Sequence, residues 1–155
     1  MTTRDVYRFL KPGKSHLDMV TETLPSSGES IVNIRLTRDV RAPALARRSL
    51  DALRPRIDAT TLDDLKLLVS ELVTNSVQHT GPDPDSWVGI RLRLLPNVIR
   101  AEITDPGLGF LRKPPPAPGD QESGRGLYLV DLISDRWGVE GYGITRVWFE
   151  IGAAA

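Results

Sequence analysis

The sequence has no cysteine, no excess charge of either sign and no long apolar run. Without cysteine, the chain forms no disulfide and has neither a thiolate zinc site nor a cysteine nucleophile. Acidic and basic residues number 20 each, so no global electrostatic attraction favours binding to nucleic acid or to a membrane. No apolar stretch approaches the roughly 20 residues of a membrane span, and the N-terminus lacks the apolar core of a signal peptide. We therefore expect a cytoplasmic protein with no membrane partner and no direct nucleic-acid partner.

The length of 155 residues and the hydrophobic fraction of 40% are typical of one soluble globular domain. Residues 1–30 are polar, contain prolines and glycines, and show no sustained period. We interpret them as an N-terminal extension that is partly ordered at best. The periodic segments occupy residues 31–151, which we predict to form the domain, and residues 152–155 form a short tail.

The periodic segments alternate between strand patterns and helix patterns. Apolar residues recur at every second position over residues 32–36, 88–94 and 99–103, which predicts strands. Wider apolar spacings predict helices over residues 39–54, 61–79 and 126–135, and a final hairpin combines residues 137–140 with 144–151. This order favours an α+β fold, a two-layer α/β sandwich whose mixed, mostly antiparallel sheet is covered on one face by helices.

The first two predicted helices carry local signals. Pro43 is tolerable only in the first turn of the helix predicted over residues 39–54. In this helix we expect Ala44, Leu50 and Leu53 to face inward. Four arginines decorate this helix as a solvated face or as a docking surface for an acidic partner: Arg41, Arg47, Arg48 and Arg54. The sequence Thr61-Leu-Asp-Asp64 resembles a capping box and predicts the start of the second helix.

Several polar residues occupy positions that periodicity places together or turns inward. Glu71 and Asn75 are four residues apart on one helix face, either as solvated surface or as a base beside an oxygen ligand for a metal. Asp105 shares the parity of the apolar residues in its strand, so it points to the buried side. It meets a polar partner there or caps the turn at the strand end. Thr145 has the same inward parity in the last strand.

The long segment 106–125 is rich in glycine and proline and leads into the third predicted helix. A loop of this length in a compact domain is usually functional or disordered. A helix N-terminus preceded by glycines offers unpaired backbone N–H groups to phosphate. A buried carboxylate can accept from an amino group such as that of adenine, an asparagine oxygen suits Mg²⁺, and a glutamate one turn away can deprotonate a hydroxyl. These chemistries together suit a magnesium nucleotide.

Three sequence boxes carry a family resemblance: Glu71…Asn75, Asp105-Pro-Gly-Leu-Gly109 and Gly124-Arg-Gly-Leu127. In this order and at these separations they resemble the Bergerat ATP-binding fold of the GHKL superfamily. That superfamily includes histidine-kinase catalytic domains, DNA gyrase and MutL. Within it, residues 31–151 look most like the stand-alone anti-sigma-factor serine/threonine kinases, whose ending resembles Thr145–Ile151.

The resemblance implies ATP and Mg²⁺ as cofactors and gives each box a role. Asn75 would hold Mg²⁺, and Glu71 would be the catalytic general base. Asp105 would accept the adenine amino group with support from Thr145. The other nucleotide-binding positions would be Gly107 and Gly109 in the lid hinge, and Gly124, Arg125, Gly126 and Leu127 at the phosphates. Arg125, Arg112 or Lys113 would neutralise γ-phosphate charge or belong to a solvated lid, and His79 receives no catalytic role.

The resemblance implies a protein kinase that phosphorylates Ser or Thr of an anti-anti-sigma partner of the STAS type. The same protein would sequester a sigma factor and form a homodimer. The alternative is a nucleotide-gated binding module, an anti-sigma-like regulator without kinase activity, which would need Asp105 and the glycines but not Glu71. A histidine-kinase fragment would need a phosphoacceptor hairpin before the domain, and a gyrase- or MutL-type ATPase would need a second domain. We expect neither in this chain.

Overall fold

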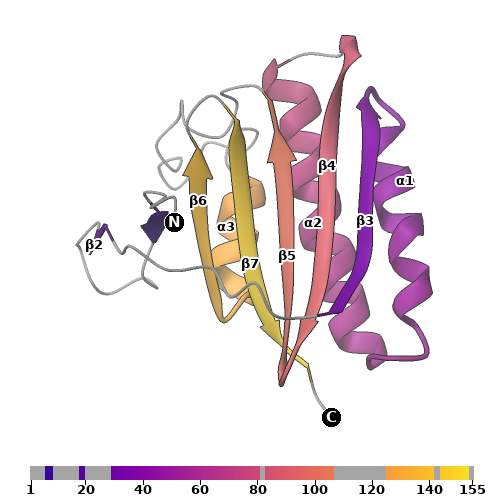
Figure 1. The fold of residues 1–155 in the computed structure, drawn as a ribbon, viewed down its shortest axis with the longest axis vertical. Helices are drawn as coiled ribbons and strands as arrows, with labels where there is room; N and C mark the ends of the chain where they lie inside the picture. Colours follow the sequence, from indigo (N-terminus) through magenta and orange to yellow (C-terminus); the bar gives the residue numbers. More distant parts are fainter. Residues whose placement is uncertain are drawn as a thin grey trace.

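A computed structural model of the chain describes residues 6–8, 18–19, 29–80, 83–106, 125–141 and 144–153. The described part contains one sheet, three α-helices and a short 3-10 helix (Figure 1). The strands are β1 (Val6–Arg8), β2 (Asp18–Met19), β3 (Glu29–Arg38), β4 (Asp83–Leu95), β5 (Val98–Asp105), β6 (Arg136–Gly141) and β7 (Thr145–Gly152). The helices are α1 (Ala42–Ser49), η1 (Leu50–Leu53), α2 (Ala59–Thr80) and α3 (Arg125–Ile133). None of these helices has both the length and the apolar character that crossing a membrane requires.

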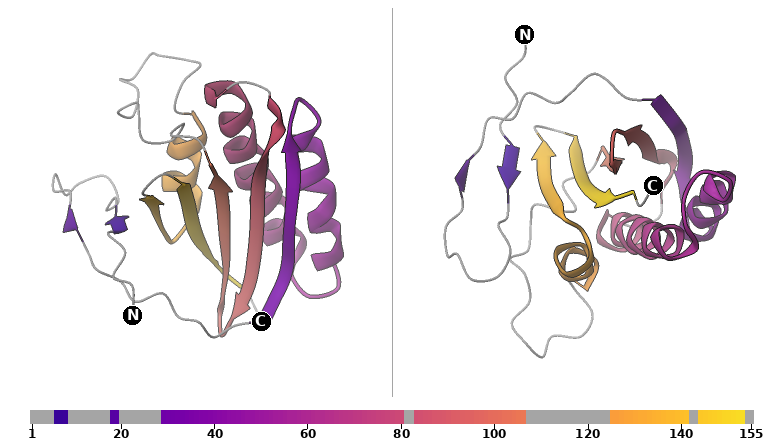
Figure 2. Two further views of the ribbon diagram at one scale, coloured as in Figure 1. Left: turned by 45° about the horizontal axis from the view of Figure 1, so that its top comes forward. Right: turned by 90° about the horizontal axis from the view of Figure 1, so that it is seen from below.

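The sheet has the strand order β2-β1-β6-β7-β5-β4-β3, and its neighbouring strands pair antiparallel throughout. The α-helices all lie on one face of it (Figure 2). The predicted α+β sandwich with helices on one face is therefore confirmed, but the prediction of a mixed sheet is wrong for the described strands, because each pairs antiparallel with its neighbours. A turn at Pro96-Asn97 joins β4 to β5, and Asn97 adopts a φ of 67°, a left-handed conformation that asparagine tolerates. The proposed division of the chain at residues 31 and 151 stays a prediction.

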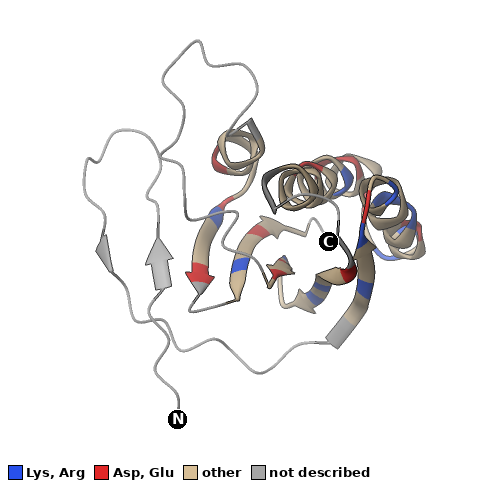
Figure 3. Cartoon of the chain, turned by 90° about the horizontal axis from the view of Figure 1, so that it is seen from above, with Lys and Arg blue, Asp and Glu red and all other residues tan. Residues whose placement is uncertain are grey.

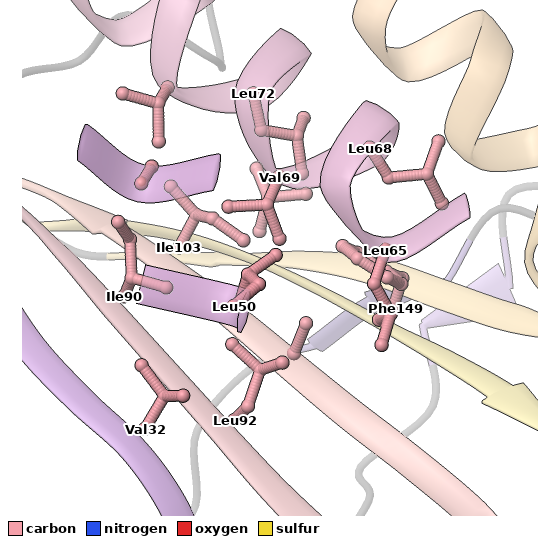
Figure 4. Close-up of a cluster of buried hydrophobic side chains, with 14 of the residues drawn as sticks. Val32, Leu50, Leu65, Leu68, Val69, Leu72, Ile90, Leu92, Ile103 and Phe149 are labelled. Atoms are coloured by element: carbon pink, nitrogen blue, oxygen red, sulfur yellow. The ribbon is translucent and has the colours of Figure 1, made fainter. Parts of the chain in front are cut away.

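The core lies between the helix-covered face of the sheet and α2 (Figure 4). The residues that recur at helical spacing along one side of α2 are all buried, as the predicted helical period requires: Leu62, Leu65, Leu68, Val69, Leu72, Val73 and Ser76. Each strand of the sheet contributes every second side chain to this core, as Ile90 and Leu92 of β4, Ile103 of β5 and Phe149 of β7 illustrate. Burial of each such side chain contributes about 1.5–3 kcal/mol, so this face holds the two layers together.

The start of α2 differs from the predicted capping box. The helix begins at Ala59, and the carboxylate of Asp58 accepts a 2.9 Å hydrogen bond from the Thr61 backbone N–H and a 2.6 Å bond from the Thr61 hydroxyl. The hydrogen bond from the Thr61 side chain lowers the pKa of Asp58. The prediction that Thr61 caps the helix is wrong, because Asp58 satisfies that N–H from outside and allows the helix to begin two residues earlier.

The predicted helix over residues 39–54 is shorter and divided into α1 and η1. Its start is delayed because the Asp39 carboxylate accepts a 2.8 Å hydrogen bond from the Arg41 backbone N–H, which makes a turn before Ala42. Pro43 lies in the first turn, as predicted. Ala44 is exposed, contrary to the prediction, because the buried positions Ala42, Ala46 and Leu50 follow one another at four-residue spacing. The four arginines predicted on this helix are exposed, and basic residues follow its outer side (Figure 3).

The opposite face of the sheet also buries charged side chains. The Arg100 guanidinium lies 2.9 Å from Glu150 and 3.1 Å from Glu102, and Glu102 also lies 2.8 Å from Arg93. Arg100 stacks at 4.0 Å on the ring of Trp148, which is fully buried. Apolar and charged residues alternate along these strands, so the apolar side chains form the core on one face and the charged side chains form buried ion pairs on the other.

Candidate functional site

The start of α3 lies against α2 with no space for a side chain at Gly126. A Cβ atom added to Gly126 would lie 2.3 Å from Nδ2 of Asn75 and 3.5 Å from the backbone oxygen of Glu71. The first distance is far shorter than any real carbon contact, so this close approach requires glycine. The N-terminus of α3, with its unpaired backbone N–H groups, therefore lies beside the turn of α2 that carries Glu71 and Asn75.

Glu71 and Asn75 occupy successive turns of α2. Asn75 is buried and Glu71 is half-buried. The Asn75 carboxamide and the backbone oxygen of Glu71 both lie next to Gly126, so these two turns of α2 form the contact with the start of α3. Asn75 thus presents its carboxamide at the N-terminus of α3, and the role of the Glu71 carboxylate one turn earlier stays a prediction.

Asp105 ends β5 and is fully buried, as its parity predicted. Its Oδ1 atom accepts a hydrogen bond of 3.1 Å from the Arg38 guanidinium, and its Oδ2 atom accepts a short hydrogen bond from the Ser76 hydroxyl. Of the two alternatives left open for the buried carboxylate of Asp105, the structure therefore shows the first, in which polar side chains of β3 and α2 hydrogen-bond to it. Since Ser76 follows Asn75 directly in α2, Asp105 lies close to the turn that approaches α3.

Thr145 lies directly opposite Asp105 in the register of β5 and β7. It is fully buried, which confirms its inward parity. The two side chains come from neighbouring strands at the same level of the helix-covered face. The structure thus brings together Asp105 and Thr145 on the sheet with Ser76 on α2, and Asn75 with Gly126 across the two helices.

Two residues of this cluster were not among the predicted site residues. Ser76 lies on the side of α2 that the helical period turns inward, but the period does not identify a partner for its hydroxyl. Arg38 has the same parity as Val32, Ile34 and Leu36, so its inward direction was visible in the sequence. An inward arginine at one strand end and an inward aspartate at another would have been a signal for an ion pair, although the sequence does not say which two strands lie close.

Other predicted positions are more peripheral or lie outside the described residues. Leu127 is half-buried and packs against the core. Arg125 begins α3, but its side chain and that of His79 are outside the description. The predictions for five loop residues also fall outside the described residues: Gly107, Gly109, Arg112, Lys113 and Gly124.

The described residues fit a magnesium nucleotide. The contact between Gly126 and Asn75 leaves the first turn of α3 without a covering side chain at that position, and backbone N–H groups of this kind bind phosphate. The carboxamide oxygen of Asn75 is a hard ligand of the type that Mg²⁺ shares with phosphate oxygens. A buried carboxylate at the end of β5 supplies a hydrogen-bond acceptor at the other side of the same α2 turn.

Comparison with known proteins agrees with this arrangement. The family described as histidine kinase-like ATPase domain matches residues 36–150. An uncharacterised protein of Streptomyces coelicolor is 40% identical over 83 residues, which cover 50% of this chain and 74% of the relative. The serine-protein kinase RsbW of Staphylococcus aureus is 28% identical over 124 residues, which cover 70% of this chain and 78% of the relative. The resemblance to the GHKL superfamily and its anti-sigma-factor kinases is thereby confirmed, and the chain belongs to the histidine kinase-like ATPase domain family.

Proposed function

We propose that the protein is an ATP-dependent serine/threonine protein kinase that phosphorylates a small anti-anti-sigma partner of the STAS type. Family membership implies ATP binding, and one relative is named a serine-protein kinase. The observation that carries the proposal is the position of Glu71 on α2, one turn before Asn75 and with its backbone oxygen next to the first turn of α3. A module that only bound nucleotide would not need a carboxylate there.

The proposed mechanism divides the work between the two helices and the sheet. Asp105, supported by Thr145, accepts the adenine amino group, and the first turn of α3 with Gly124, Arg125 and Gly126 binds the phosphates. Asn75 holds Mg²⁺, which when bound neutralises charge on the β- and γ-phosphates. Gly107 and Gly109 serve as the hinge of the lid. This set positions the γ-phosphate for attack, which is most of what phosphoryl transfer requires.

Glu71 acts on the nucleophile rather than on the nucleotide. It accepts the proton of the partner's Ser or Thr hydroxyl as the oxygen attacks the γ-phosphorus and the bond from phosphorus to the β,γ-bridging oxygen breaks. ADP is then the leaving group, and the proton resides on the Glu71 carboxylate until it passes to water.

The test separates binding from transfer in the full-length protein. Each variant is incubated with γ-labelled ATP and a panel of purified STAS-type proteins from the same organism, and ATP affinity is measured by calorimetry. Glu71→Gln should bind ATP as the wild type does and lose about a hundredfold or more in transfer rate. Asp63→Asn, which removes an exposed carboxylate from the same helix, is the control. Undiminished transfer by Glu71→Gln would refute the assignment of the base.

The proposal extends to the partners. We propose that the protein also sequesters a sigma factor and acts as a homodimer, as its resemblance to the anti-sigma-factor kinases implies. ATP binding without labelling of any STAS-type protein would favour the nucleotide-gated binding module over the kinase.

A further inference from the structure

The ion pair between Arg38 and Asp105 connects two strands that are not neighbours. Arg38 ends β3 at the edge of the sheet, and β4 lies between β3 and β5 (Figure 1). The side chain is only 7% exposed, and its guanidinium lies 3.1 Å from the Asp105 carboxylate. The Arg38 side chain thus extends past β4 to reach Asp105, and both side chains are buried, unlike those of a surface ion pair.

We propose that Arg38 is a positioning residue for nucleobase recognition, which holds Asp105 as the acceptor for the amino group of an adenine base. This inference rests on the proposed role of Asp105 in nucleotide binding. It gives a function in base selectivity to a residue outside the three sequence boxes.

Stability alone gives little reason for a buried ion pair at this position. Two apolar side chains of similar volume commonly stabilise a fold as well as a buried ion pair, because desolvation of the two charges offsets their attraction. The same face of the sheet is apolar at neighbouring levels, where Val88 and Ile103 are fully buried. A charged pair at the end of this apolar face is therefore better explained by what the carboxylate does.

The donors around Asp105 determine what it can recognise. Arg38 and Ser76 both donate hydrogen bonds, one to each carboxylate oxygen, and so fix the orientation of the group. The guanidinium also compensates the negative charge that a buried carboxylate would otherwise carry alone. A carboxylate held in this way accepts from a purine with a 6-amino group and opposes a purine with a 6-oxo group. Loss of Arg38 should thus reduce the discrimination between bases more than it reduces overall nucleotide affinity.

The experiment measures this discrimination by calorimetry on the full-length protein. The two probes are ATP and purine riboside triphosphate, which lacks the 6-amino group. The wild type should prefer ATP by about tenfold or more, the value of a hydrogen bond to a charged acceptor. Arg38→Gln should lose most of this preference, and Asp105→Asn should lose it as well. The double variant should show no further loss, because Arg38 acts through Asp105.

A matched control comes from the same strand. Arg35→Gln removes an arginine three residues away on the opposite, exposed face of β3, and it should leave the preference unchanged. Arg38→Lys, which keeps the charge but loses the planar fork of donors, should recover part of the preference. It also provides the test if Arg38→Gln does not fold, which circular dichroism would reveal.

The possible outcomes differ in what they overturn. Equal weakening of both probes by the Arg38 variants would mean a purely structural role, and tighter ATP binding would mean that Arg38 competes with the base; either result overturns the inference. An unchanged preference in folded Arg38 variants overturns it as well. A wild-type protein that binds neither probe would overturn the proposed function, and this inference with it.

Discussion

The helix-covered face of the sheet and the opposite face differ in where they bury charged side chains. On the helix-covered face, the described strands bury charge at their ends, where Arg38 meets Asp105. On the opposite face, buried charges lie in the middle of the sheet and alternate in sign from Arg93 through Glu102 and Arg100 to Glu150. On the helix-covered face, Arg38 and Ser76 both donate hydrogen bonds to one carboxylate, that of Asp105. On the opposite face, the charged side chains form a linked series of ion pairs.

This difference shows that burial of charge does not by itself identify a functional site. On the opposite face the charged side chains pair with one another and Arg100 stacks on Trp148, and the glycine that approaches this group, Gly138, faces the indole ring rather than a helix N-terminus. The Asp105 cluster lies beside Asn75 and Gly126, where backbone N–H groups are available. We therefore expect variants of the opposite face to change stability, and variants of the helix-covered end to change nucleotide binding.

The largest expected effect is the loss of stability in Arg100→Met. Arg100 is 1% exposed and pairs with two glutamates, so its removal leaves buried carboxylates without their cation. We expect the free energy of unfolding to fall by about 3–5 kcal/mol, measured by urea denaturation.

A similar stack on the same face provides the control for Arg100. Arg35 lies 4.1 Å over the ring of Trp87, but it is exposed. Arg35→Met should cost only about 0.5–1 kcal/mol, the value of an exposed cation–π contact. Equal losses from the two substitutions would show that the stacking, rather than the buried ion pairs, stabilises this face.

The second prediction concerns the glycine beneath Trp148. A Cβ atom at Gly138 would lie 2.9 Å from three atoms of the indole ring of Trp148, which is fully buried. Gly138→Ala should therefore lower the free energy of unfolding by about 1–3 kcal/mol in the same assay. Gly89→Ala is the matched control, because its Cβ atom would lie at the longer distance of 3.1 Å from the ring of Trp87, which is only half-buried. A loss at Gly89 as large as that at Gly138 would contradict this explanation.

Much of the fold was predictable from the sequence because its periods are clear. The two-residue period placed Asp105 and Thr145 on the inner face, and the helical period placed the buried side of α2 correctly. Helix starts were less predictable, since the side chain that satisfies the first N–H groups decides them. Asp58 and Asp39 determine those starts, and Thr61 does not.

The contacts between distant segments were not predictable from local pattern. Arg38 and Asp105 are 67 positions apart, and a register shift between Thr37 and Arg38 adjusts the end of β3. The approach of Gly126 to Asn75 depends on how two helices pack, which sequence spacing does not encode. The alternation of apolar and charged residues in β4, β5 and β7 also does not distinguish a solvated face from one that buries ion pairs.

The third prediction tests the helix-covered end through Gly126→Ala. The new Cβ atom would displace the Asn75 carboxamide, because the two would otherwise lie 2.3 Å apart. ATP affinity in the presence of Mg²⁺ should fall about tenfold or more, since displaced metal-site groups typically cost this much. Affinity without Mg²⁺ should change less, and urea denaturation should show a smaller loss of stability than Gly138→Ala. Gly152→Ala, at an exposed strand end, is the control, and an unchanged dependence on Mg²⁺ in Gly126→Ala would contradict the proposed role of Asn75.

The smallest expected effect is a change in the acid sensitivity of the opposite face. Burial alone would raise the pKa of Glu102, but the guanidinium groups of Arg93, Arg100 and Arg146 outweigh burial and lower the pKa from its usual 4.5. The folded protein then holds this proton less tightly than the unfolded chain does, so the contribution to stability is present above about pH 4.5 and is lost as the pH falls below it. Glu102→Gln cannot titrate and should reduce the slope of unfolding free energy against pH on the acid side.

That slope should be reduced rather than abolished in Glu102→Gln. The pKa values of Asp39, Asp51 and Asp58 are also lowered, by hydrogen bonds from the side chains of Arg41, Lys66 and Thr61 respectively, and these groups still titrate in the variant. Urea denaturation at several pH values from about 6 to about 3 would measure the difference, with Asp63→Asn as the variant that removes an exposed carboxylate. Parallel curves for wild type and Glu102→Gln would mean that the ion pairs of the opposite face do not favour ionised Glu102 in the folded state. The contribution of the opposite face to stability would then come from the packing of its side chains and not from the charges of its ion pairs.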